Sequence, residues 1–224
     1  MKMISKLLQL ILPKQCFKMV YLYRHVYKLI TREGSYLVET GYVNSVLRLE
    51  PVNKLNQPIP WMNYSFLDFL EPRLNNSMTV FEYGAGYSTY YLADKVKGVT
   101  SIEYDKEWLD MVKNELKNKN NCEVLYYQLG DGYHTAIEDQ KGKVFDLIIV
   151  DGRERVKCAK NALPFLSEKG VLLLDDSWRE TYKEVFIFYA KKGYKEISFS
   201  RIKPGGLLTE QTTVFYKEGN VLGI

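Results

Sequence analysis

Cysteine and histidine are scarce in this chain. Its 224 residues include three cysteines and two histidines, and Cys16, Cys122 and Cys158 lie far apart. No Cys-x-x-Cys pair and no mixed Cys/His spacing occurs, which argues against a structural zinc site. Few and scattered cysteines also argue against a disulfide framework. We therefore expect a reducing, cytoplasmic compartment.

A hydrophobic run long enough to cross a membrane is also missing. The apolar stretch from Ile4 to Leu12 is short and ends at Pro13, whereas a spanning helix needs about 20 apolar residues. No small-residue cleavage site follows this stretch, so we do not expect a secretory signal.

Acidic residues are absent from the first 32 positions, which carry seven lysines and arginines. Residues 1–60 hold nine basic and three acidic residues, a net charge of +6, and residues 61–224 hold 22 and 24, a net charge of −2. A slightly acidic main domain is not expected to bind nucleic acid.

The basic segment from Lys14 to Arg32 has the pattern of an amphipathic helix. Lys14, Lys18 and Lys28 fall near one face, and apolar residues such as Met19, Leu22 and Val26 fall on another. Two interpretations stay open. The helix packs on the main domain or on a second subunit, or it lies on an anionic membrane surface at the inner face of the membrane.

From Thr79 onward, hydrophobic patterning predicts alternating strands and helices. Nearly continuous apolar runs, as in Phe145–Val150, are typical of central parallel strands. Strands are predicted over residues 79–83, 99–104, 122–128, 145–151 and 170–175, and helices over 88–96, 106–119, 131–139, 155–166 and 180–192. Residues 196–202 and 211–217, joined by Pro204-Gly205-Gly206, are predicted to form an antiparallel hairpin.

The preceding residues are predicted to connect this domain to the basic helix. Pro51, Pro58 and Pro60 favour an extended crossing over the surface, and residues 61–70 have a helical pattern. The prediction is therefore a helical and extended N-terminal segment over residues 1–60, followed by one α/β domain over residues 61–224.

The stretch Thr79-Val-Phe-Glu-Tyr-Gly-Ala-Gly-Tyr-Ser-Thr89 predicts a strand, a tight turn and a helix start. Gly84 and Gly86 allow a sharp bend and a close approach of the backbone to a ligand. Glu82 argues against a pyrophosphate ligand, because like charges repel, and Thr89 stands where a pyrophosphate-binding turn has its third glycine. A carboxylate here suits a ligand with a cationic end.

Acidic residues follow each of the five predicted parallel strands. They are Glu82, Glu103, Asp131, Asp151 and the pair Asp175-Asp176. Glu103 comes 21 residues after Glu82, a spacing that suits a carboxylate accepting ribose hydroxyls. Asp131, between Gly130 and Gly132, is placed to accept an adenine amino group.

Each acid alone is equally explained as a helix N-cap or a solvated loop charge. Gathered at one sheet edge, unpaired acids would be costly, so they imply a cationic ligand or a metal. Arg153 and Arg155 are the neighbouring bases that would otherwise neutralise them.

Together these motifs resemble the class I S-adenosylmethionine (SAM)-dependent methyltransferases, over about 140 residues from Thr79 to Lys217. Within that family the chain is similar to bacterial enzymes that modify glycans and small molecules. The resemblance implies a Rossmann-like, seven-stranded, mostly parallel sheet with a terminal antiparallel hairpin. It also implies SAM as cofactor, bound by Glu82, Gly84, Ala85, Gly86, Ser88, Glu103, Tyr104, Asp131, Gly132 and Asp151.

Cation-dependent O-methyltransferases of this family hold Mg²⁺ with acids after strands four and five. Asp151, Asp175 and Asp176 occupy matching positions, and oxygen ligands suit Mg²⁺. The chain departs from that pattern at Ser177, where an asparagine is common, and the sequence leaves the metal open. Without a metal, Asp151 and His134 are the candidate catalytic residues.

The resemblance implies methyl transfer from SAM to an oxygen, or with less support a nitrogen, of a sugar or small metabolite. Two alternatives remain. One is an aminopropyltransferase on a related fold. The other is a protein of this fold without catalysis, which acts as an assembly partner through its N-terminal helix.

Overall fold

The computed structural model describes residues 13–130 and 132–224. The prediction for Ile4–Leu12 and the adenine-binding role of Asp131 lie outside the described residues. Within them, no helix combines the length and apolar character needed to cross a bilayer.

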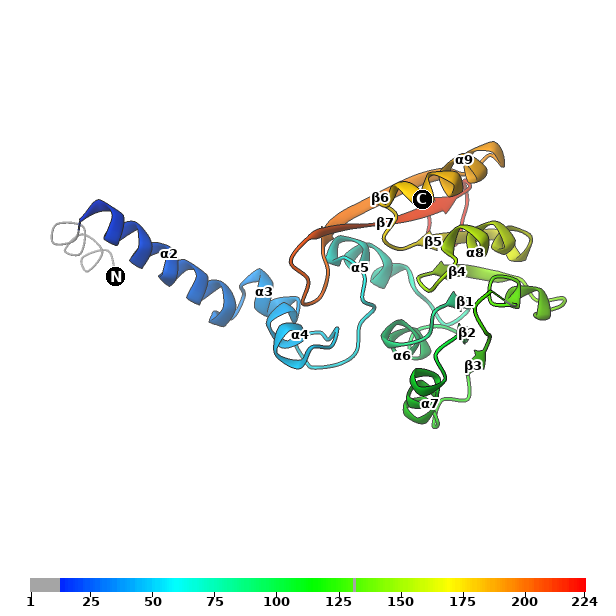
Figure 1. Ribbon diagram of the computed structural model, residues 1–224, viewed down its shortest axis with the longest axis horizontal. Helices are drawn as coiled ribbons and strands as arrows, with labels where there is room; N and C mark the ends of the chain where they lie inside the picture. The colour runs from blue at the N-terminus through cyan, green and yellow to red at the C-terminus, as the bar shows by residue number, and fades with distance from the viewer. Residues whose placement is uncertain (1–12, 131) are drawn as a thin grey trace.

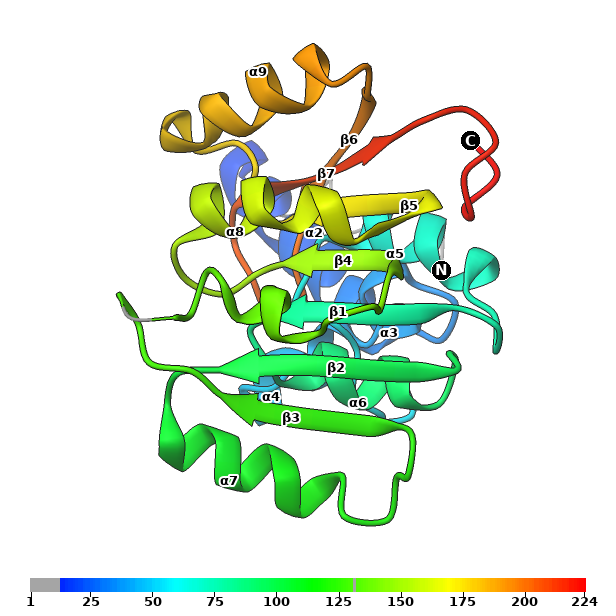
Figure 2. The ribbon, with the colours of Figure 1, turned by 90° about the vertical axis from the view of Figure 1, so that its right-hand side faces the viewer.

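Seven strands form one sheet in the order β3-β2-β1-β4-β5-β7-β6 (Figure 2). The strands are β1 (Thr79–Tyr83), β2 (Gly98–Glu103), β3 (Cys122–Tyr126), β4 (Phe145–Val150), β5 (Leu166–Leu174), β6 (Lys195–Ile202) and β7 (Thr209–Tyr216). The first five are parallel, β7 runs antiparallel to β5, and β6 pairs with β7 in the terminal hairpin. The predicted fold class and the hairpin are confirmed.

Alternation along the strands assigns each apolar side chain to one face of the sheet, because successive side chains point to opposite faces. Val80, Leu147 and Ile149 face one layer of helices, and Phe81 and Ile148 face the other. The first layer contains α5 (Tyr64–Leu70), α6 (Tyr87–Ala93) and α7 (Lys106–Glu115), and the second contains α8 (Arg155–Ala162) and α9 (Lys183–Lys191).

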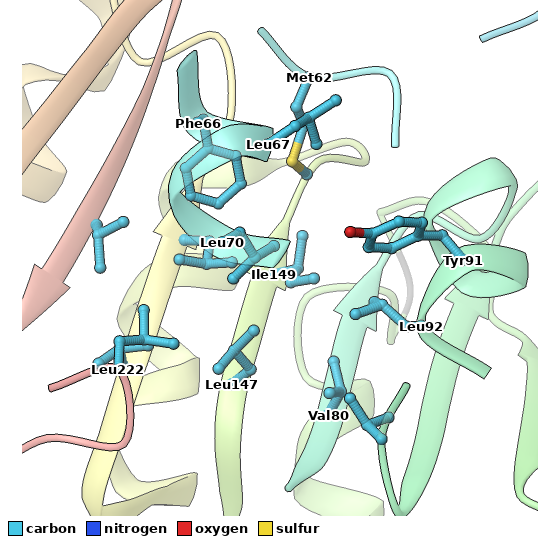
Figure 3. Close-up of a cluster of buried hydrophobic side chains, with 14 of the residues drawn as sticks. Met62, Phe66, Leu67, Leu70, Val80, Tyr91, Leu92, Leu147, Ile149 and Leu222 are labelled. Carbon is cyan, nitrogen blue, oxygen red and sulfur yellow. The ribbon is translucent and has the colours of Figure 1, made fainter. Parts of the chain in front are cut away.

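Helix α5 shows how the first layer is held. Its Phe66 and Leu70 are buried against the sheet, above Leu147 and Ile149 (Figure 3). The helix begins after Asn63, whose side-chain oxygen accepts a hydrogen bond from the backbone N–H of Phe66 at 3.0 Å. The Asn63 amide donates to Phe199 of β6. This N-cap therefore ties the start of the domain to the terminal hairpin.

The connections differ from the sequence prediction in two places. Residues 132–139 contain only a short 3₁₀ helix, η2 (Ala136–Asp139). Gly132 adopts a positive φ, which a right-handed helix does not allow, so the helical turn begins only at Ala136. Before the predicted extended crossing at residues 51–60, the chain forms two short helices that were not predicted individually, α3 (Tyr36–Glu39) and α4 (Tyr42–Arg48). The left-handed glycine Gly41 separates them.

The predicted basic helix is present as α2 (Lys14–Thr31), and it projects from the domain (Figure 1). None of its residues is buried, and tyrosines and aliphatic residues on it are exposed. In this chain α2 therefore does not use its apolar face to pack on the main domain, which leaves a second subunit or a membrane surface as the predicted partner.

Candidate functional site

The turn after β1 is shaped by two close contacts. Gly84 has a φ of 99°, and a Cβ there would lie 3.0 Å from Gly152. A Cβ on Gly86 would lie 3.3 Å from the Trp108 ring. The Trp108 indole N–H also donates to the carbonyl of Ala85 at 2.7 Å. Glycine is therefore required at Gly84, a side chain at Gly86 would press on Trp108, and α7 holds the turn from one side.

Glu82 lies beneath this turn and is fully buried. Its Oε2 accepts hydrogen bonds from Ser101 Oγ at 2.6 Å and from Thr89 Oγ1 at 2.8 Å. Thr89 Oγ1 in turn accepts from the backbone N–H of Gly86 at 3.0 Å, which explains a threonine at the third-glycine position. Glu82 Oε1 has no hydrogen-bond partner among the described residues.

Burial raises the pKa of Glu82, against the opposing effect of the Ser101 and Thr89 hydroxyls. An orphaned buried carboxylate oxygen is costly. Glu82 does not line the cleft above the turn. It supplies negative charge from behind the turn rather than from the cleft wall.

Glu103 ends β2 and reaches the same turn from the other side. Its Oε2 accepts from the backbone N–H of Ala85 at 3.2 Å, and its Oε1 accepts from those of Tyr104 and Asp105 at 2.8 and 3.0 Å. These bonds fix the orientation of the carboxylate. Oε1 uses both of its lone pairs, and Oε2 keeps one for a hydroxyl donor.

A cavity of 390 Å³ opens above these groups, and we call it the β1–β2 cleft. Its walls combine carboxylates with aromatic rings, which suits a ligand that has hydroxyls, a flat ring and a positive centre. The lining residues are Trp61, Gly84, Ala85, Gly86, Tyr87, Ser88, Glu103, Tyr104, Asp105, Trp108, Asp151, Gly152, Arg153 and Arg155. Most of the predicted cofactor residues thus meet at one cavity. Gly132 is not among the lining residues, and Asp131 is not described.

The acids after β4 and β5 are paired with cations. Arg155 Nη2 lies 2.8 Å from Asp151 Oδ1, and Arg155 Nη1 lies 3.5 Å from Asp176 Oδ2. The guanidinium also donates to the carbonyls of Asp151, Gly152 and Asp175. Arg155 therefore neutralises this cluster as predicted.

The larger contribution comes from Lys203, which sequence reasoning missed. Its Nζ lies 2.7 Å from Asp175 Oδ2, 2.8 Å from Asp176 Oδ1 and 2.7 Å from Glu210 Oε2. Only 9% of Lys203 is exposed. Burial alone would lower the pKa of Lys203, but the surrounding carboxylates raise it above its usual range, so the side chain stays protonated.

Tertiary contacts place Lys203 here. It follows β6 in a turn closed by the Gly206 N–H on the Lys203 carbonyl at 2.9 Å. The Trp61 indole N–H donates to the Pro204 carbonyl at 3.0 Å, and the Tyr42 hydroxyl donates to the Gly206 carbonyl at 2.8 Å. No sequence motif marks Lys203, because Asp175 and Asp176 lie 28 and 27 residues away along the chain and meet it only through the hairpin.

Asp176 carries further signs of a constrained site. It adopts a left-handed φ of 53°, which is uncommon for a residue with a side chain. Burial would raise the pKa of Asp176, but Lys203 and Arg155 together lower it below its usual value. The pKa of Asp151 is shifted in the opposite direction. Burial and repulsion from Asp175 raise its pKa, against the opposing charges of Arg155 and Lys203.

These contacts decide whether the three predicted ligands fit a divalent cation. Asp175 accepts from Lys203 and from Thr212, Asp176 accepts from Lys203 and Arg179, and Asp151 is paired with Arg155. Across residues 13–130 and 132–224, no group of three His, Cys, Asp or Glu side chains is arranged to hold a metal ion. The residues present do not fit Mg²⁺, because two basic side chains occupy the space between the carboxylates.

Two other predicted residues lie elsewhere. His134 Nδ1 lies 3.4 Å from Glu154 Oε2, and His134 lines neither the β1–β2 cleft nor the pocket described next. Arg153 donates to the Tyr104 hydroxyl at 3.2 Å instead of pairing with the acids. The structure thus brings Asp151 to the site without His134.

A second cavity of 460 Å³ adjoins the cleft, and we call it the β6–β7 pocket. Its lining residues are Trp61, Asp151, Arg155, Asp176, Lys203, Gly205, Gly206 and Glu210. Trp61, Asp151 and Arg155 line both cavities. Within the described chain, Asp151 Oδ1 is paired with Arg155 and its Oδ2 has no hydrogen-bond partner. Asp151 therefore presents a free oxygen where the two cavities meet.

A larger cavity of 630 Å³ lies among α3, α5 and α6. It shares no lining residue with the other two cavities and contains none of the predicted site residues. Size alone therefore does not identify the site, since the acids at the strand ends gather elsewhere.

Comparisons with known proteins agree on the fold. No protein family model and no curated protein matches the sequence. Among solved structures, the chain is similar to the O-methyltransferase TomG from Streptomyces achromogenes, which is involved in tomaymycin synthesis and was solved with SAM. The TM-score is 0.57 at 14% identity, covering 87% of this chain and 95% of that one.

Two further structures show the same likeness. An O-methyltransferase from Bacillus cereus in complex with S-adenosylhomocysteine (SAH) matches with a TM-score of 0.56 at 16% identity, covering 85% of this chain and 96% of that one. An rRNA methylase from Streptococcus thermophilus matches with a TM-score of 0.51 at 15% identity, covering 69% and 95%. At these identities the comparisons show that the chain has the class I methyltransferase fold.

Proposed function

We propose that this chain is a SAM-dependent methyltransferase acting on a hydroxyl of a small polar acceptor, with a sugar or small metabolite as the substrate class. The observation that carries the proposal is the shared wall between the β1–β2 cleft and the β6–β7 pocket. Asp151 lines both cavities and keeps one carboxylate oxygen free of hydrogen bonds among the described residues.

The β1–β2 cleft suits the cofactor. When bound there, SAM supplies an electrophilic methyl group on a sulfonium centre. Oε2 of Glu103 accepts a hydrogen bond from a ribose hydroxyl, and the buried charge of Glu82 favours the cationic methionine half. Trp108 and Tyr87, with ring centroids 6.2 Å apart, form an aromatic wall.

The β6–β7 pocket suits the methyl acceptor. The free Oδ2 of Asp151 would accept the hydroxyl proton as the acceptor's oxygen bonds to the methyl carbon. The carbon–sulfur bond would break in the same step and leave SAH. Holding that oxygen beside the cofactor lowers the entropic part of the barrier. The donors of Lys203 and Arg155 are engaged by carboxylates and carbonyls, so the pocket repels phosphates. This favours a neutral or cationic small molecule over a nucleic acid.

Isothermal titration calorimetry with SAH tests the cofactor site. Glu103→Ala is expected to weaken binding about 10- to 150-fold, because it removes a hydrogen bond to a charged group worth about 1.5–3 kcal/mol. Glu107→Ala, at an exposed position in the first turn of α7, is the matched control and should bind as the wild type does. An unaltered chain that binds neither SAM nor SAH would overturn the proposal and favour an assembly role.

Turnover of a panel of hydroxylated and amine acceptors tests the acceptor site. Asp151→Asn should abolish methyl transfer while SAH affinity changes only a few-fold, because the amide keeps the shape of the carboxylate but cannot take a proton. Equal turnover by Asp151→Asn and wild type would exclude Asp151 as the base. Aminopropyl transfer from decarboxylated SAM in the same assay would favour the alternative enzyme class.

We also propose that α2 contacts an anionic membrane surface. Its residues 14–31 contain no acid, and Lys14 and Lys18 are exposed along with Tyr21, Tyr23 and Leu22. Basic charge beside exposed aromatic residues suits a headgroup region. A second copy of α2 would bring the same positive charge against itself, which disfavours direct α2–α2 pairing.

Liposome flotation of the full chain checks this surface. Replacing the basic residues of α2 by glutamine should abolish binding to vesicles that contain phosphatidylglycerol, whereas vesicles of phosphatidylcholine alone should bind neither protein. Replacing Lys106, Lys113, Lys117 and Lys141, exposed lysines of the main domain, is the charge-matched control and should leave binding unchanged. No flotation, with a dimer in light scattering that the α2 substitutions dissolve, would show an oligomer contact instead.

A further inference from the structure

The carboxylates at the carboxyl ends of β4 and β5 surround basic side chains instead of an open ion site. Asp175, Asp176 and Glu210 each place one oxygen within 2.8 Å of Lys203 Nζ. An ammonium has three N–H donors, so these three carboxylates use all of them. Arg155 closes the other side, between Asp151 and Asp176.

Charge in this cluster is nearly balanced without a metal. Four carboxylates, those of Asp151, Asp175, Asp176 and Glu210, face three cations, those of Lys203, Arg155 and Arg179. A divalent ion would have to displace a buried ammonium whose charge is already matched. That exchange would leave Lys203 buried without partners, which is costly.

We infer that Lys203 is an internal replacement for a divalent cation, and that it holds Asp175, Asp176 and Glu210 in place at the acceptor pocket in a metal-independent enzyme. The role in methyl transfer rests on the proposed function. The cation arrangement itself does not, because it follows from the contacts of Lys203 alone. Lys203 is a positioning residue, since its donors are all engaged by this protein's own carboxylates.

The arrangement also narrows the acceptor class. Lys203 and Arg155 direct their hydrogen bonds and ion pairs at carboxylates and carbonyls of this protein, and the oxygens that remain at the β6–β7 pocket are those of Asp151 and Glu210. Such a pocket accepts hydrogen bonds but does not offer cationic ones. The acceptor should therefore present hydroxyl or ammonium groups at this wall. A carboxylate or phosphate placed there would be repelled.

Mn²⁺ binding followed by electron paramagnetic resonance tests the inference on the full chain. The wild type is expected to show no saturable Mn²⁺ site, and chelator treatment should leave SAH affinity and any methyl transfer unchanged. Lys203→Met frees three carboxylates and should bind Mn²⁺ at least about tenfold more tightly than the wild type does, because the repulsion among them then favours a divalent ion. Lys203→Arg keeps the charge and should restore the wild-type behaviour.

Lys195→Met is the matched control, because Lys195 lies on β6 and pairs with Glu218 at the exposed edge. It should not gain Mn²⁺ affinity. If Lys203→Met is partly unfolded in buffer, recovery of a cooperative unfolding transition on adding Mn²⁺, absent in Lys195→Met, supports the inference. Saturable Mn²⁺ binding by the wild type that Asp175→Asn removes would overturn it. SAH titrations in parallel report on the proposed function separately, since the β1–β2 cleft binds SAH without Lys203 in its lining.

Discussion

The acids at the two halves of this sheet edge are satisfied by different partners. Glu82 and Glu103 are held by hydroxyls and backbone N–H groups, which are neutral. Asp175 and Asp176 are held by the ammonium of Lys203 and by guanidinium groups. Neutral donors leave the first pair with its negative charge, which suits a cationic cofactor. Cations cancel the charge of the second pair, which makes a metal unnecessary.

The largest effect on stability is expected from the variant that removes the ammonium of Lys203. Lys203→Met should lower the free energy of unfolding by about 3–5 kcal/mol at neutral pH, because it leaves buried carboxylates without their partner. Urea unfolding measures this value. Lys195→Met removes an exposed pair and should have a much smaller effect. Similar losses in both variants would contradict the contrast between the two halves.

The pH dependence of that loss follows from Asp176, whose pKa is lowered in the folded state. A lowered pKa contributes stability above the unfolded value of about 4, and that stability is lost as the pH falls through the folded value. Lys203→Met removes the main cause of the lowering. The gap between wild type and variant should therefore be widest at neutral pH and should narrow under acidic conditions.

An intermediate effect on stability is expected at Glu82, in the half of the sheet edge where neutral donors hold the acids. Glu82→Gln should stabilise the free protein by about 1–3 kcal/mol at neutral pH, since it removes a buried charge that only hydroxyls satisfy. Its SAH affinity should fall at the same time. The pKa of Glu82 is raised, so the cost of its charge appears above the folded pKa and disappears below the unfolded value. The stability gain should thus vanish at acidic pH in urea unfolding; a gain that persists there would point to packing instead of charge.

The smallest effect on stability is expected at Arg153, in contrast to its neighbour Arg155. Arg153 makes one hydrogen bond to Tyr104 and no ion pair among the described residues, whereas Arg155 is buried among carboxylates and carbonyls. Arg153→Gln should change the melting temperature by no more than a few degrees. Arg155→Gln should lower it clearly more. Equal shifts would mean that both arginines neutralise the acids, as the sequence alone suggested.

The structure around the β1–β2 cleft was largely predictable from the sequence, because its determinants are local. Gly84, Gly86 and Glu82 lie within five residues, and the strand before them and the helix after them follow from patterning. Predictions failed where a loop has no local signal. Gly132 takes a positive φ, so the helix expected over residues 131–139 is reduced in the described residues to a short 3₁₀ turn.

The structure around the β6–β7 pocket was predictable from the sequence only in part. Sequence spacing placed Asp151, Asp175 and Asp176 at one edge, which the parallel sheet confirms. It gave no sign of Lys203, since a lysine near a Pro-Gly-Gly turn is ordinary on a surface. For the same reason the sequence did not decide whether a metal binds there. The same acidic residues are expected whether a metal ion or a lysine ammonium lies between their carboxylates.

The sequence by itself determined the succession of strands and helices, the turn after β1 and the acids that follow the strands, because hydrophobic periodicity and turn glycines are local properties of the chain. Only the tertiary structure decided what neutralises those acids. The antiparallel β6–β7 hairpin returns Lys203 to the ends of β4 and β5, and Trp61 and Tyr42 hold its turn there. Charge compensation depends on distances of a few ångströms between residues far apart in sequence, which no local pattern encodes.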